Sequence, residues 1–225
     1  MKRFLTAILS AIGLSSSAAS ETNMVDPKEI YFSLATINDA LPATDASEKP
    51  TTNDLVIHED DWRQFEAVAS SYSAEIKAEI ADVQKIFKEK SEVSGEYRIF
   101  KEMHVRKRIA NPLPKPTSWT NLLAAAGVQE SSVARVGIRG EGFVKDGFSF
   151  PVAALRVFGI RHDDNVDVLC FDLTRTPGLS EEAANRLGAF LESAGVVFVH
   201  WPSATVLDDK EKVVKFLRQK NEMKN

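Results

Sequence analysis

The chain contains a single cysteine, Cys170, in 225 residues. One thiol cannot close a disulfide within a chain, so the fold must be stabilised by its core alone. Glycine (11) and proline (9) are also scarce, which excludes collagen and linker proteins. Cys170 lies between Leu169 and Phe171, and this apolar setting predicts a buried, unreactive thiol.

The short motifs of several common enzyme classes are missing. The sequence has no G-x-S-x-G, no P-loop, no G-x-G-x-x-G and no H-E-x-x-H. Residues 163–165 (Asp-Asp-Asn) begin like a calcium loop but lack the later glycine and glutamate, so we expect a turn. These absences favour a protein that has no cofactor and is not an enzyme.

Composition is that of a globular protein, with 44% hydrophobic and 27% charged residues and a net charge of −4. The negative charge argues against a nucleic-acid partner. No run after residue 20 reaches the roughly 18 apolar residues of a membrane span, so we expect no stable membrane insertion.

The first twenty residues have the order of a secretory signal peptide. Lys2 and Arg3 precede an uncharged run over 4–14, and a small-residue stretch follows over 15–20. We therefore predict a cleavable signal peptide at residues 1–20 and a periplasmic or secreted protein. The alternative is a short buried helix, with translation starting at Met24.

Residues 21–57 form an acidic leader that we expect to be largely irregular. From Glu21 to Asp61 there are ten acidic residues against two lysines, with Pro42 and Pro50 between them. Such a leader serves as a solvated tether, or as a carboxylate-rich strip that fills a basic groove on a partner.

Residues 58–225 are predicted to form one α+β domain, with a mainly antiparallel sheet of five to six strands flanked by helices. Apolar spacing at i, i+4 and i+7 predicts a helix over 73–90, and the spacing over 62–69 suggests another before it. Strand-like alternation covers 96–109, and further strands are expected at 133–138, 143–144, 148–152, 155–160, 166–173 and 196–201. Hairpin turns at 145–147 and 163–165, and helices at 117–127, 179–194 and from 208 onwards, complete the domain.

A basic strip runs from Tyr97 to Pro116 and carries a net charge of +5 in an otherwise acidic protein. One interpretation is a binding site for an acidic partner protein. The others are an edge strand charged against aggregation and a strand that pairs with the acidic leader. The candidate partner-binding residues are Lys101, Arg106, Lys107 and Arg108, together with the acidic triplet Glu59, Asp60 and Asp61.

His104, His162 and His200 each fall in or beside a predicted strand. If they converged, they would make a zinc site of an exported metal-dependent hydrolase. Nothing in their spacing requires this, so three hypotheses remain. The first is an exported, non-enzymatic protein that inhibits or neutralises a partner, for example an immunity protein against an envelope-delivered toxin. The second is the hydrolase, and the third is a secreted effector or envelope assembly factor.

Overall fold

The structure is a computed structural model of the chain and describes residues 30–45, 49–95, 97–113, 117–152, 155–172 and 180–222. The chain divides into two units, residues 1–30 and 31–225, and the helices and strands named below belong to the second. The predicted signal peptide, residues 1–20, lies outside the described residues. In the described ranges no helix has both the length and the apolar content that crossing a membrane requires.

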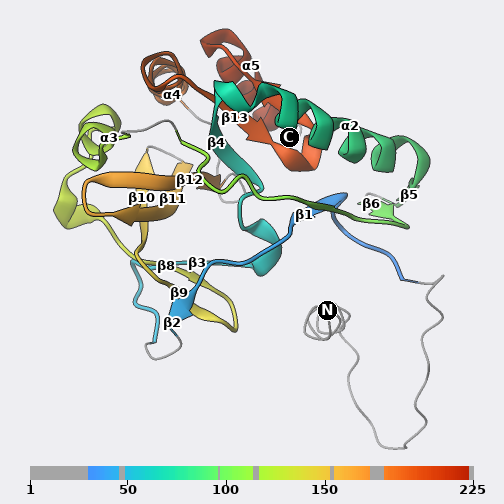
Figure 1. The fold of residues 1–225 in the computed structure, drawn as a ribbon, viewed down its shortest axis with the longest axis horizontal. Helices are drawn as coiled ribbons and strands as arrows, with labels where there is room; N and C mark the ends of the chain where they lie inside the picture. The colour runs from blue at the N-terminus through green and yellow to red at the C-terminus, as the bar shows by residue number, and fades with distance from the viewer. Residues whose placement is uncertain are drawn as a thin grey trace, which may run out of the picture. The chain divides into compact units, whose positions relative to one another are not determined.

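A six-stranded sheet of order β10-β11-β12-β4-β13-β14 forms the centre of the fold (Figure 1). Its strands are β4 (Phe65–Ala69), β10 (Gly147–Val152), β11 (Leu155–His162), β12 (Asn165–Asp172), β13 (Val196–His200) and β14 (Thr205–Leu207). Every neighbouring pair is antiparallel. The predicted α+β fold with a mainly antiparallel sheet is therefore confirmed.

Helices α3 (Trp119–Ala126), α4 (Glu181–Ala194) and α5 (Lys210–Glu222) cover one face of this sheet. Alternation along β13 shows how the two faces are built, because successive strand side chains point to opposite sides. Val196 and Phe198 pack with the three helices, whereas Val197 and Val199 pack on the other face.

The second face is covered by two different elements. Helix α2 (Ser73–Glu89) packs Ile76 and Ile80 against β4 and β13. A four-stranded sheet of order β2-β9-β8-β3 packs against β11 and β12. Its strands are β2 (Thr44–Asp45), β3 (Leu55–Ile57), β8 (Val136–Ile138) and β9 (Gly142–Val144).

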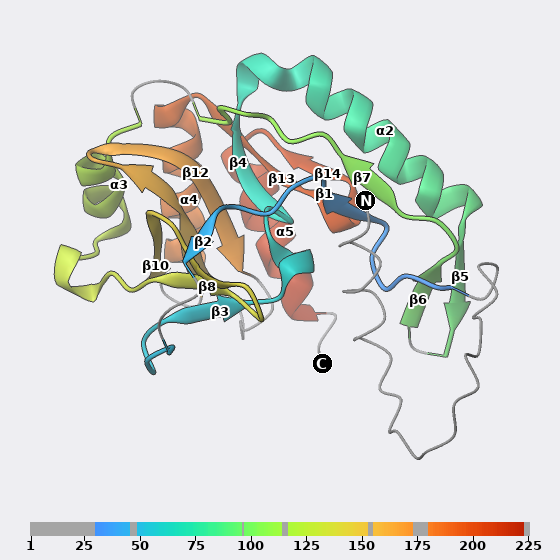
Figure 2. The same cartoon turned by 60° about the horizontal axis from the view of Figure 1, so that its bottom comes forward.

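Two small strand pairs complete the unit. β1 (Thr36–Asn38) pairs in parallel with β7 (His104–Arg106), and β5 (Ser91–Ser94) forms an antiparallel hairpin with β6 (Tyr97–Phe100). Figures 1 and 2 both show the hairpin at the C-terminal end of α2, away from the six-stranded sheet. Single 3₁₀ turns lie at Glu59–Asp61, Ser70–Tyr72, Glu130–Ser132 and Trp201–Ser203.

Several sequence predictions are confirmed. Helix α2 buries the predicted stripe, and α3 begins after Ser118, whose hydroxyl accepts from the backbone N–H of Asn121. Gly127 ends α3 with φ +67°, a conformation that glycine adopts without steric cost. Cys170 is fully buried, and burial raises the pKa of its thiol.

The helix predicted over 62–69 is wrong. Glu59–Asp61 form one 3₁₀ turn, and Phe65–Ala69 are β4, all five residues of which are buried. A central strand has apolar side chains on both faces, and in a segment this short that pattern also satisfies helical spacing. The buried Glu66 further obscures the strand, because a carboxylate is not expected there.

Other boundaries also differ from the predictions. The single strand expected over 96–109 is broken into β6 and β7. The turn at Asp146 forms, with φ +57°, but β9 and β10 join different sheets and make no hairpin. The leader at residues 21–57, expected to be largely irregular, supplies β1, β2 and β3 in its described part, and β14 was not predicted. The leader strands escape detection because each is only two or three residues long.

Candidate protein-interaction surface

Most large exposed apolar side chains lie on or beside the β5–β6 hairpin and the strand pair β1–β7. The described part of the structure has five large hydrophobic residues that are exposed: Val93 and Tyr97 on the hairpin, Val105 on β7, Tyr31 next to Phe32, which bridges to Phe100 of β6, and Leu41 beyond β1. Tyr97 is 74% exposed and Val93 is 67% exposed. We call Tyr31, Val93, Tyr97 and Val105, with the exposed cations Arg98, Lys101, Lys107 and Arg108, the hairpin surface.

The hairpin is held to the fold by an aromatic anchor. Phe100 is 4% exposed and packs edge-on against Phe87 of α2, with ring centroids 5.1 Å apart. Its backbone N–H and C=O both bond to Phe32, at 2.9 and 2.8 Å. Gly95 follows β5 with φ +63°, which a residue with a side chain rarely adopts. A rigid base therefore carries the exposed tip.

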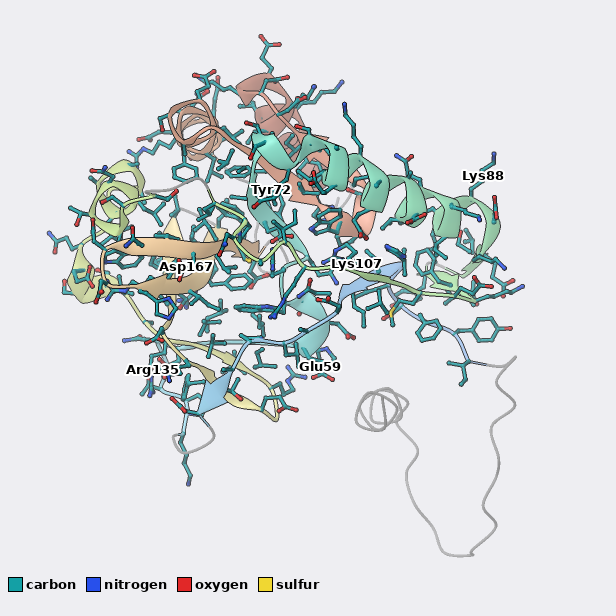
Figure 3. All side chains as sticks on the ribbon, viewed as in Figure 1. Glu59, Tyr72, Lys88, Lys107, Arg135 and Asp167 are labelled. Carbon is teal, nitrogen blue, oxygen red and sulfur yellow. The ribbon has the colours of Figure 1, made fainter. Side chains whose placement is uncertain are left out.

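Ion pairs brace the hairpin on its flanks. Lys101 Nζ lies 2.8 Å from Glu92 Oε2, and this hydrogen bond raises the pKa of Lys101. Lys90 pairs with Glu102, and Arg98 Nη1 donates to Ser91 Oγ across 2.7 Å. Figure 3 shows Lys88 of α2 on the side of the fold that carries the hairpin. The exposed rings are thus set among charged groups of both signs.

The basic strip meets the acidic leader, as one of the alternatives predicted. Thr36, Ile37 and Asn38 pair with His104, Val105 and Arg106. Beyond them the backbone N–H of Arg108 donates to Asp39 Oδ1 at 3.3 Å. Backbone hydrogen bonds, more than charge, make this pairing. Lys101, Lys107 and Arg108 remain exposed on it.

Arg106 is not part of the exposed strip, which corrects the sequence interpretation. Its side chain is 1% exposed, because strand alternation turns it inward. It donates to Thr36 Oγ1 at 3.0 Å, to Gln64 Oε1 at 3.3 Å and to the Arg63 carbonyl at 3.0 Å. Burial lowers the pKa of Arg106 to about 10. Its role in the structure is to tie β1 and β7 to the main sheet.

A second buried arginine lies beside it. Arg63 Nε is 2.6 Å from Glu66 Oε2, and both side chains are at most 5% exposed. Glu66 Oε1 accepts the indole N–H of Trp201, over whose ring the Arg106 guanidinium lies at 4.7 Å. Sequence reasoning missed this network. The available hint was Glu66 within an otherwise apolar stretch.

The acidic triplet forms the 3₁₀ turn before β4. Burial raises the pKa of the Asp60 and Asp61 carboxyls, and His58 Nδ1 lies 3.4 Å from Asp60 Oδ2. In the described part of the chain no ion pair joins the triplet to the cations of the hairpin surface. The two halves of the predicted partner site are therefore separate features.

The three strand histidines have separate partners. His104 Nε2 lies 2.6 Å from Glu79 Oε2, and His200 Nδ1 lies 2.6 Å from Ser203 Oγ. His162 is held between Asp167 and Asp146. Among the described residues, no three His, Cys, Asp or Glu side chains are arranged to hold a metal ion.

An apolar hollow lies between α3, α4 and the sheet. Arg186 is the one charged residue in its lining, and that guanidinium pairs with Glu182. Ligand pockets combine an apolar wall with several convergent polar groups. This hollow has no such set and does not define an active site.

Comparison with models of protein families, with curated proteins and with solved structures found no match for this chain.

Proposed function

We propose that this chain is an exported, non-enzymatic binding protein that inhibits a partner protein through its hairpin surface. An immunity protein that neutralises an envelope-delivered toxin is the concrete form of this proposal. The observation that carries it is the exposure of Val93 and Tyr97 on the two faces of the β5–β6 hairpin, with exposed Tyr31 and Val105 on the segments beside it. Exposed aromatic side chains set among polar residues are typical of protein-interaction sites.

The residue types support a protein partner. Tyrosine and arginine are enriched among the side chains that dominate binding energy, and Tyr97 and Arg98 are both exposed on β6. Lys107 and Arg108 add exposed positive charge beside Val105, which complements an acidic surface. The expected partner is therefore a protein with an acidic surface around an apolar depression.

Export rests on the predicted signal peptide at residues 1–20. It is tested together with partner binding by mild affinity purification of the C-terminally tagged chain from its native cells, with sequencing of its N-terminus. The proposal expects a mature start near Glu21 and one protein partner in stoichiometric amount. An uncleaved N-terminus would contradict export.

The surface is tested with two matched serine variants. Tyr97→Ser is expected to weaken partner binding by at least about tenfold, because aromatic anchors carry a large share of interface energy. Leu41→Ser removes an exposed apolar side chain outside the hairpin surface and is expected to leave binding unchanged. Equal affinity of the two variants would contradict the assignment of the surface.

A further inference from the structure

The outer edge of β5 has backbone groups that nothing in the described chain covers. β5 and β6 form a two-stranded sheet, and β5 has no second neighbour in the described residues. Glu92, Val93 and Ser94 are exposed. Such an edge can pair with another strand, and native proteins usually protect it.

The hydrogen bonds of the hairpin identify which groups face outward. In an antiparallel pair, residues that bond each other alternate with residues whose N–H and C=O point away. The N–H and C=O of Phe100 both bond to Phe32 and therefore point away from β5. Ser91 lies opposite Phe100 in the hairpin, so the N–H and C=O of Ser91 likewise point away from β6. The adjacent pair fits this alternation, because the Lys101 N–H donates to the Lys90 carbonyl and these two residues therefore face each other. Two residues beyond Ser91, the N–H and C=O of Val93 therefore point out from the free edge.

The usual protective features are weak on β5. The strand has no proline, and its pairing with β6 is regular from Ser91 to Ser94. Its one charged residue, Glu92, is paired with Lys101 at 2.8 Å. Native edge strands are usually protected by charge, proline, bulges or short length, and of these β5 relies mainly on its short length.

The sequence of this edge is compatible with its own copy. When two β5 strands pair antiparallel about Val93, each Val93 opposes the other Val93 and donates to it and accepts from it. Glu92 then opposes Ser94, and Ser91 opposes Gly95, so no two like charges lie opposite each other. The two Arg98 side chains are separated by three strand spacings, roughly 14 Å.

We propose that the β5 edge pairs antiparallel with β5 of a second copy of this chain, centred on Val93, to give a four-stranded sheet β6-β5-β5-β6. This inference goes beyond the proposed function and does not depend on it. Four residues per strand bury far less than the roughly 1,200 Å² of a stable interface, so the dimer is weak and forms at high concentration.

Cysteine cross-linking of the purified full-length chain tests the register, because the single native cysteine is fully buried. Val93→Cys is expected to link to itself under mild oxidation about tenfold faster than the control Leu41→Cys, since directly opposed residues have the Cα separation of a disulfide. A mixture of Glu92→Cys and Ser94→Cys is expected to form a cross-linked heterodimer. Each of these variants alone is expected to cross-link more slowly than the mixture. Equal rates for all variants would overturn the proposal.

Sedimentation of the unmodified chain, from about 10 to 500 µM, gives an independent readout of weak self-association. A monomer–dimer equilibrium is expected for the wild type and for Val93→Thr, and its loss is expected for Val93→Pro. Proline removes an N–H that has no partner within the hairpin, so the circular dichroism of the monomer stays the same. A chain that stays monomeric at every concentration would overturn the proposal. That result is also the one expected if β5 pairs only with a strand of another protein. Partner capture is measured separately, so failure of either proposal leaves the other standing.

Discussion

Trp201 donates its indole N–H to the buried carboxylate of Glu66 across 2.8 Å, although 135 positions separate them. Glu66 lies on the central strand β4, and Trp201 begins the turn after β13. The bond therefore joins two neighbouring strands of the main sheet and fixes the end of β13 against the start of β4.

Removal of this donor is expected to destabilise the protein. Trp201→Phe leaves a buried carboxylate oxygen without a partner, and we expect a loss of about 1–3 kcal/mol in the free energy of unfolding. Urea denaturation measures it. Trp119→Phe is the matched control, because the acceptor of Trp119 is Glu130, which is 58% exposed and can bond to water. An equal loss in both variants would show that ring volume alone matters.

Loss of the buried Arg106 guanidinium should lower the free energy of unfolding by more than loss of the Trp201 donor does. Arg106→Met leaves Thr36, Gln64 and the Arg63 carbonyl without their shared donor, and we expect a loss of about 3 kcal/mol or more. Amide hydrogen exchange is expected to rise first in β1. Arg108→Met, on the exposed side of the same segment, should change stability by less than about 0.5 kcal/mol. Indistinguishable unfolding curves for the two variants would contradict the role given to Arg106.

His162 should titrate above its ordinary pKa of 6.5, because its Nδ1 bonds to the Asp167 carboxylate. The pairing of protonated His162 with Asp167 stabilises the folded protein in full below pH 6.5, the ordinary pKa of histidine. This stabilisation is lost as the pH rises through the higher pKa of His162 in the folded protein. Asp167→Asn is expected to bring the NMR titration of His162 back towards 6.5. Asp208→Asn, which breaks an ion pair with Lys212, serves as the control. A His162 titration that Asp167→Asn leaves unmoved would rule out this assignment.

Gly159 should not tolerate a side chain. A Cβ added there would lie 1.8 Å from the Val168 carbonyl oxygen and 3.1 Å from the Phe148 ring. Because the clash is with backbone in the main sheet, Gly159→Ala is expected to cost about 3 kcal/mol or to prevent folding. Gly140→Ala has open space around its Cβ, and its φ of +81° should limit the cost to about 1 kcal/mol. Thermal melting compares the two, and a stable Gly159→Ala would refute the contact.

Sequence patterns correctly predicted the helices whose apolar spacing and capping residues lie within the segment itself. Helix α2 follows from its apolar spacing, and α3 follows from Ser118 and Gly127 at its ends. β4 could not be predicted in this way, because Phe65–Ala69 becomes a strand through pairing with β13. That partner lies about 130 positions away, and no local pattern encodes it.

The exposure of the residues on the hairpin surface could be predicted only in part. The basic strip correctly drew attention to Lys101, Lys107 and Arg108 as exposed cations. Arg106 has the same side-chain type and stands next to Lys107, yet alternation places it inside. Tyr97 and Val93 became prominent only when the structure gave their exposure, since in sequence they resemble ordinary core residues of a strand.

The position of β4 in the main sheet has a consequence for the order of folding. Its neighbours are β12 and β13, and Glu66 is paired with Cys170 on one side and Val199 on the other. A nascent chain that ends before residue 165 therefore contains the middle of the sheet without either strand that flanks it. Closing loops of this length is slow, so we expect folding to follow completion of synthesis and not to accompany it. Until then Phe65–Ala69 remains an unpaired, mostly apolar segment that chaperones can bind.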